Sequence, residues 1–113
     1  MDEDLRQFIR TAIGSVWALE ILLLLRARRD RAWTTDTLAQ ELRSNPSLVV
    51  QVFAELEAAG LVAAGEDGYV YHPASEVLER LCARLEKRYR VSPVTVVNAI
   101  ASSQPNLKTL RRS

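Results

Sequence analysis

The segment from residue 34 to residue 72 constrains the fold of this chain more than any other feature. Two stretches, 34–42 and 46–61, place apolar residues three or four positions apart, and two short apolar runs follow at 61–64 and 69–72. The runs are separated by a turn that begins and ends with glycine. Helical spacing predicts amphipathic helices, and paired runs around a glycine-bounded turn predict a β-hairpin.

Residues at the expected element ends support this interpretation. Thr34 or Thr35 can cap the first helix, and Pro46 suits the first turn of the second helix because its missing N–H has no intrahelical partner there. Gly60 can adopt the left-handed conformation that ends a helix. On the second helix, four residues form one core-facing stripe: Val49, Val52, Phe53 and Leu56. The order helix, helix, strand, turn, strand predicts a winged helix-turn-helix over about residues 33–73.

Helices are also predicted on both sides of this unit, at about 4–29, 75–90 and 93–102, and the first is expected to bend or break at Gly14-Ser15. A length of 113 residues is enough for one hydrophobic core and too little for two. We therefore expect a single domain over residues 1–103, followed by a tail at 104–113. The predicted fold class is mainly α with a small two-stranded β wing.

The stretch 16–25 is apolar nearly all round, with Glu20 as its one charged residue. A helix of this kind must be covered on more than one side, and a second copy of the chain is an available cover. We therefore expect a homodimer. The candidate interface residues are Trp17, Ile21, Leu24, Leu78, Leu81, Leu85, Tyr89, Val97 and Ile100.

The same stretch is roughly half as long as the ~20 residues that cross a bilayer, so no membrane association is expected. The chain opens with Met-Asp-Glu-Asp, which lacks the positive start of a secretory signal, and a cytoplasmic location is expected. Paired catalytic acids and bases, a phosphate-binding loop and clustered metal ligands are absent from the sequence. We therefore expect neither an enzyme nor a bound metal or cofactor. Cys82 lies on an apolar helical stripe and is expected to be buried.

Residues 38–42, with the sequence Leu-Ala-Gln-Glu-Leu, are followed by the core stripe and by Glu57-Ala-Ala-Gly-Leu-Val62. This pattern resembles bacterial winged-helix transcriptional regulators of the MarR, PadR and ArsR type over about half of the chain. The resemblance implies a homodimer that binds double-stranded DNA, with the helix from Pro46 in the major groove and residues 65–68 at the wing tip. By position, the residues that match the exposed start of a recognition helix are Arg43, Asn45, Ser47, Leu48 and Gln51.

The charge distribution departs from that family. Residues 44–79 contain six acids and no Lys or Arg, whereas residues 80–113 sum to +7. Basic side chains that contact phosphates supply most non-specific affinity for DNA, and the acids Glu66 and Asp67 stand at the wing tip. Four residues of the helix at 75–90 are candidates to restore a positive surface if that helix folds beside the recognition helix: Arg80, Arg84, Lys87 and Arg88. Otherwise they solvate the outside of a dimerisation helix.

A second hypothesis is a winged-helix module that has lost DNA binding and binds a protein. Leu48, Val50 and Ala54 lie beside Glu55 on the second helix of the motif. An apolar centre with a polar rim suits a small protein interface.

Overall fold

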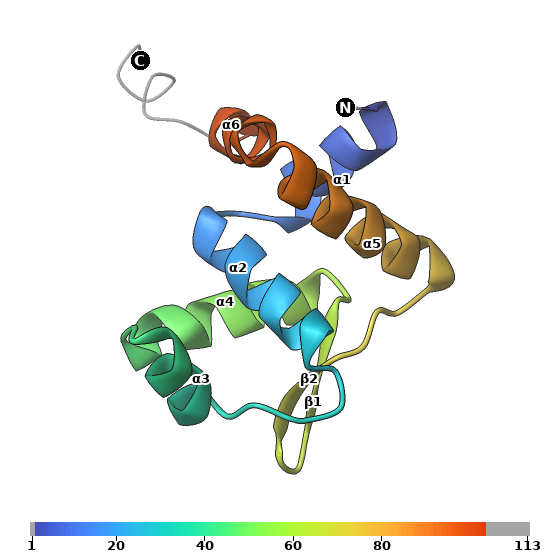
Figure 1. Ribbon diagram of the computed structural model, residues 1–113. Helices are drawn as coiled ribbons and strands as arrows, with labels where there is room; N and C mark the ends of the chain where they lie inside the picture. Colours follow the sequence, from blue (N-terminus) through green and yellow to red (C-terminus); the bar gives the residue numbers. More distant parts are fainter. Residues whose placement is uncertain (1, 104–113) are drawn as a thin grey trace, which may run out of the picture.

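The computed structural model describes residues 2–103, and within that range the chain forms helices and one two-stranded sheet (Figure 1). The helices are α1 (Glu3–Ala12), α2 (Val16–Ala27), α3 (Thr35–Leu42), α4 (Pro46–Ala58), α5 (Glu76–Val91) and α6 (Pro93–Ser103), and the strands are β1 (Val62–Gly65) and β2 (Gly68–Tyr71). The predicted fold class, mainly α with a small β wing, is confirmed.

The helices of the motif begin and end where the sequence indicated. The Thr34 hydroxyl accepts a hydrogen bond from the Thr37 N–H at 3.0 Å, and the Thr37 hydroxyl accepts one from the Thr34 N–H at 2.9 Å. This reciprocal pair satisfies two backbone donors that the first turn of α3 would leave unpaired. Pro46 opens α4, and Gly60 follows α4 with a φ of 78°.

The long first helix expected at 4–29 is two helices, which meet at an angle of 104°. Ile13 is extended, and the Ser15 hydroxyl accepts a hydrogen bond from the N–H of Ala18 at 3.0 Å, which starts α2 afresh. The expected break at Gly14-Ser15 is thus confirmed. Within residues 2–103, only α1 and α2 taken together across this bend reach the length and apolarity of a membrane span, and no single helix does.

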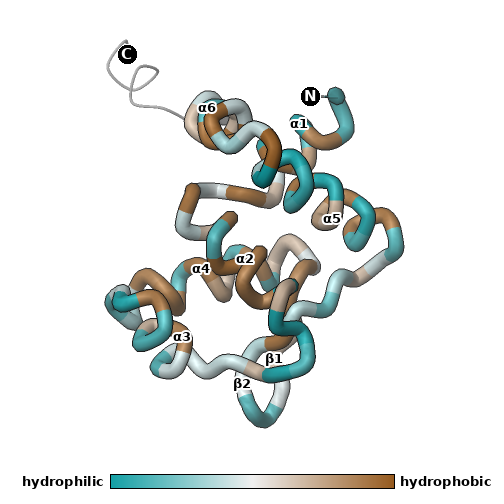
Figure 2. The backbone as a smooth tube through the Cα atoms, viewed as in Figure 1, coloured by the Kyte–Doolittle hydropathy of each residue, from teal (hydrophilic) through white to brown (hydrophobic). Residues whose placement is uncertain are grey.

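The elements form two groups with α2 between them (Figure 1). In one group, α1, α5 and α6 pack against one another. In the other, α3, α4 and the β-hairpin form the winged unit, which packs on α2 through α4 and β2. Figure 2 shows α2 as a largely hydrophobic segment in the middle of the molecule, and its residues Leu19, Ile21, Leu22 and Leu25 are fully buried.

Three of the candidate dimer residues lie in the core of the single chain. Ile21 and Leu85 are 0% exposed and Ile100 is 2% exposed, so these side chains have no surface left for a second copy. Leu85 and Ile100 are covered because α5 and α6 pack against each other and against α1, and Ile21 lies on α2, which packs against α4 and β2. On α6, Val96 is buried while Val94 is 69% exposed.

The hairpin is short and tightly held. Its strands pair with Gly65 opposite Gly68, which leaves Glu66 and Asp67 as the two turn residues. Trp33 adds a third segment to the sheet through N–H···O bonds of 2.8 Å in both directions with Tyr69. A Cβ atom on Gly68, whose φ is 125°, would lie 2.4 Å from the Trp33 carbonyl oxygen. Gly68 is therefore required for this close approach.

Candidate binding surface

The turn between α3 and α4 presents the first candidate residues. Arg43 ends α3 in the left-handed region with a φ of 54°, and its side chain is exposed. Asn45 caps α4, because its Oδ1 accepts a hydrogen bond from the N–H of Leu48 at 2.9 Å. Ser47, in the first turn of α4, is also exposed. The structure thus places Arg43, Asn45 and Ser47 together at one exposed corner.

Two further candidates are less free than their positions in the sequence indicated. Leu48 is half-buried and packs against the core. The Nε2 atom of Gln51 lies 3.5 Å from the Oε2 atom of Glu55, one helical turn away. A carboxamide that reads adenine needs both its donor and its acceptor. The acceptor of Asn45 is used as a cap, and the donor of Gln51 faces Glu55.

The outer face of α4 continues as an uncharged stripe with acidic borders. Val50 is 54% exposed, and Ala54 and Ala58 are exposed on the same side. Glu55 and Glu57 flank this stripe, and the hydroxyl of Tyr69 in the hairpin lies 3.5 Å from an oxygen of Glu57. We call the exposed residues of 43–58, together with Glu66 and Asp67, the winged surface.

Arginines stand near both ends of α3. Arg43 stands at the C-terminal end, and Arg31 lies before the N-terminal end, where its guanidinium stacks 4.0 Å from the centre of the Trp33 ring. Glu66 and Asp67 are exposed at the wing tip, which Figure 2 shows as hydrophilic. The winged surface therefore contains one arginine, Arg43, together with acidic groups on α4 and the wing.

The basic cluster of α5 lies elsewhere. Figure 1 shows α5 beside α1 and α6, apart from the first turn of α4 next to α3. Arg84 pairs with Asp2, and Arg80 lies 3.8 Å from Glu76 on its own helix. The helix at 75–90 therefore does not fold beside the start of the recognition helix, and its basic residues do not add positive charge there. The basic residues of the tail at 104–113 lie outside the described residues.

Comparisons with protein families, curated proteins and solved structures found no match. Function must therefore be inferred from the side chains of the winged surface and its surroundings.

The remaining dimer candidates keep some exposed surface. Trp17 is 42% exposed, while Leu24, Leu78, Leu81, Tyr89 and Val97 are half-buried. The hydroxyl of Tyr89 donates to an oxygen of Glu20 at 3.1 Å and so joins α5 to α2.

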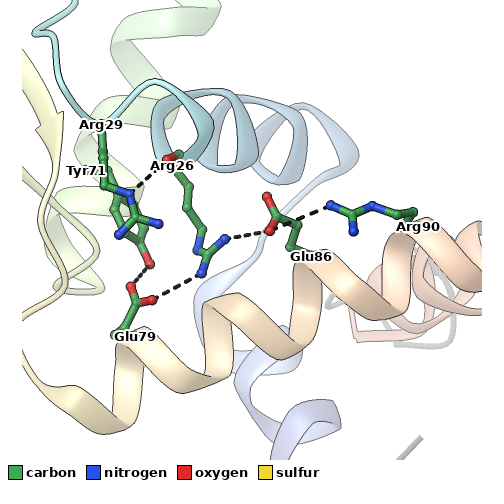
Figure 3. Close-up of polar contacts among 6 residues, drawn as sticks. All are labelled: Arg26, Arg29, Tyr71, Glu79, Glu86 and Arg90. Carbon is green, nitrogen blue, oxygen red and sulfur yellow. Dashed lines mark hydrogen bonds and ion pairs between the residues drawn. The ribbon is translucent and has the colours of Figure 1, made fainter.

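A polar cluster that the sequence did not indicate fastens α5 to α2 and the hairpin (Figure 3). The guanidinium of Arg26 donates to Glu86 at 2.6 Å and to Glu79 at 3.1 Å. The hydroxyl of Tyr71, in β2, donates to the other oxygen of Glu79 at 2.6 Å. Arg29 completes the cluster by donating to the carbonyl oxygen of Arg26 at 3.3 Å.

The environment of this cluster shifts the pKa of several groups, Glu79, Tyr71 and Cys82 among them. The hydrogen bond from Tyr71, together with the pairing to Arg26, lowers the pKa of Glu79. Burial and the bond to Glu79 raise the pKa of Tyr71. Burial raises the pKa of Cys82, whose side chain is fully buried as expected from its apolar stripe. These shifts keep Glu79 charged and Tyr71 protonated, which suits a structural link between elements.

Proposed function

We propose that the chain is a winged-helix DNA-binding transcriptional regulator that acts as a homodimer in the cytoplasm. The observation that carries the proposal is the exposed corner at the start of α4, where Arg43, Asn45 and Ser47 stand together on a helix-turn-helix followed by a hairpin. In this arrangement the first turn of a helix enters the major groove and its side chains meet base edges.

The charges around the corner determine the expected strength and salt dependence of DNA binding. Arg31 and Arg43 flank α3 and supply two phosphate contacts per protomer, so a homodimer makes about four. Each phosphate contact contributes about −0.9 to the slope of log affinity against log salt, which gives a slope of roughly −3.6. Ser47 and the amide NH2 group of Asn45 supply hydrogen bonds to base edges. Binding on these terms is weak on random DNA and depends strongly on base contacts.

The homodimer is proposed to form through the exposed part of α2. Trp17 is 42% exposed at the start of this helix, and large aromatic side chains are enriched at protein interfaces. Light scattering at micromolar concentration is expected to give twice the protomer mass of 12.7 kDa, and Trp17→Glu is expected to return the protomer mass. Val50→Glu is the matched control, because Val50 is 54% exposed on α4. This variant is expected to leave the dimer intact. A wild-type mass of 12.7 kDa that does not change with concentration would exclude the dimer.

A second candidate function is a winged-helix module that binds a protein through the same surface. The exposed Val50 and Ala54, bordered by Glu55 and Glu57, favour it, because DNA phosphates repel acidic borders while a protein interface accepts a polar rim.

Binding to mixed genomic DNA fragments across a salt series separates the two functions. Binding at about 50 mM salt with a slope near −3.6 supports DNA recognition, and Arg43→Ala is then expected to reduce the slope by about 1.8, since each homodimer loses two contacts. Ser47→Ala is expected to relax preference at one base pair by about 1–3 kcal/mol. Arg80→Ala, on α5, is the matched control and is expected to leave the slope unchanged. No binding at about 50 mM salt would exclude the DNA-binding function and favour the protein-binding one.

A further inference from the structure

A groove with a volume of about 560 Å³ runs between α1 and α5. These two helices lie apart from the first turn of α4 (Figure 1). Residues at helical spacing line the groove from both sides: Asp4, Gln7, Phe8 and Thr11 on α1, and Val77, Leu78, Arg80, Leu81 and Arg84 on α5. Seven residues of a helix rise roughly 10 Å, so the groove follows both helices for about two turns. Its shape matches the space beside two neighbouring helices in which a third helix packs.

The floor of the groove is apolar and partly uncovered. Phe8 is buried at the bottom, Leu78 and Leu81 are half-buried, and Val77 is 60% exposed. An amphipathic helix that lies in such a groove inserts apolar side chains spaced three or four residues apart. The floor therefore fits the apolar side of a helix.

The two rims of the groove differ in charge. On the α5 side, the side chains of Arg80 and Arg84 are 70% and 41% exposed, and each also pairs with an exposed acid, Glu76 and Asp2 respectively. On the α1 side, Gln7 and Thr11 are uncharged and Asp4 carries a negative charge. An incoming helix thus requires acidic residues on the flank that faces α5, and neutral or basic residues on the other flank.

The basic rim continues along α5 into a second hollow of about 320 Å³, which shares Arg84 with the groove. Lys87 and Arg88 line this hollow with Leu5 and one acid, Asp2, and Val91, which is 67% exposed, stands at its end. From Val77 to Val91, α5 rises roughly 21 Å, which is about four helical turns. A partner helix of about 14 residues matches this length.

We propose that the groove between α1 and α5 binds an acidic amphipathic α-helix of a partner protein. Charge complementarity with Arg80, Arg84, Lys87 and Arg88 selects this partner over the basic tail at 104–113, which has the same sign of charge as the rim. The apolar floor selects it over DNA, whose backbone offers no apolar side chains to Val77 and Leu81. The groove lies outside the winged surface, so the proposal is independent of what α4 binds.

The test uses two 16-residue peptides with leucines three or four positions apart. One peptide carries glutamates on one flank of the leucine stripe, and the other carries lysines at the same positions. Fluorescence anisotropy with the full chain is expected to give micromolar binding of the acidic peptide and at least about tenfold weaker binding of the basic peptide. Equal affinity of the two peptides, or no binding of either at about 1 mM, would overturn the proposal.

Two pairs of variants locate the binding. Val77→Asp and Arg80→Glu change the floor and the rim, and each is expected to weaken the acidic peptide at least about fivefold. Val94→Asp on α6 and Arg90→Glu on α5 are the matched controls: Val94 is 69% exposed, the Arg90 side chain is 74% exposed, and neither lines the groove. The controls are expected to stay within about twofold of the wild type.

Equal effects of the variants and their controls would place the peptide elsewhere and refute the proposal. Circular dichroism verifies that each variant keeps the helical fold, and these four positions are exposed enough for the fold to tolerate a charge. Self-association of the wild type that Val77→Asp abolishes would identify a second copy of the chain as the occupant and would also refute the proposal.

Discussion

The cluster around Arg26 leads to a stability prediction whose size follows from its geometry. The side chain of Arg26 is 12% exposed and donates to Glu86 at 2.6 Å and to Glu79 at 3.1 Å. A hydrogen bond to a charged group contributes roughly 1.5–3 kcal/mol, but the two carboxylates are 27% and 37% exposed, so water replaces part of each bond when the guanidinium is removed. We expect Arg26→Met, which keeps the aliphatic stem, to lower the free energy of unfolding by about 2 kcal/mol.

Arg90 provides a matched control on the same carboxylate. It lies 3.9 Å from Glu86 with its side chain 74% exposed, and exposed pairs one helical turn apart contribute about 0.3–0.5 kcal/mol. Urea unfolding followed by far-ultraviolet circular dichroism measures both variants at one protein concentration, since dimerisation would make stability depend on concentration. Equal, small losses for Arg26→Met and Arg90→Met would show that the cluster does not fasten α5 to α2, and would refute the reasoning.

The pH dependence of the same variant gives a second readout. The pKa of Glu79 is lowered in the folded chain by Tyr71 and Arg26, so its contribution to stability is present above the ordinary carboxyl pKa of 4.5 and is lost as pH falls towards the folded value. We therefore expect the difference between wild type and Arg26→Met to shrink as the pH falls below 4.5. A difference that stays constant down to acid unfolding would contradict the charged pairing.

Three other variants test the wing, a helix cap and the buried phenol. Gly68→Ala is expected to cost more than about 2 kcal/mol in urea unfolding, because its Cβ would meet the Trp33 carbonyl oxygen at 2.4 Å, whereas Gly65→Ala, with its nearest neighbour at 3.7 Å, is expected to be far milder. Asn45→Ala is expected to cost about 1 kcal/mol through the lost cap of α4, and an unchanged unfolding midpoint would argue against that cap. The pKa of Tyr71 is raised in the folded chain, so its contribution to stability is fully present below pH 10.0 and is lost as the pH rises further. Tyr71→Phe is expected to reduce the loss of stability at alkaline pH. An unchanged alkaline loss would contradict the raised pKa of Tyr71.

Local patterns in the sequence were enough to predict the winged unit. The stripe of Val49, Val52, Phe53 and Leu56 faces the core as its spacing indicated, and the cap at Thr34 lies where a short polar residue precedes apolar periodicity. The same reasoning also located the wing to within a residue at each strand. These features depend on neighbours a few positions away, which a single sequence displays directly.

Features that depend on distant segments could not be predicted in this way. An apolar stripe must be buried, but its spacing does not say whether its own chain or a second copy covers it. Ile21, Leu85 and Ile100 were therefore expected at a dimer interface, whereas they are buried within the single chain. The partners of Arg26 lie 53 and 60 residues away, and no local pattern links them. The basic residues of α5 are a further example, because the sequence does not say whether α5 folds beside α4.

The sharp corner between α1 and α2 also affects the order in which the molecule assembles. Within α3, α4 and the hairpin, contacts join elements that are neighbours along the chain, whereas α1 packs against α5 and α6, which begin at least 64 positions after α1 ends. Closing such a large loop costs entropy before any contact rewards it, so we expect the winged unit to fold early and the α1–α5–α6 layer to close late. The groove between α1 and α5 would then be the last binding surface to exist during folding and the first to be lost on local unfolding, so an occupant of that groove would stabilise the late-closing layer selectively.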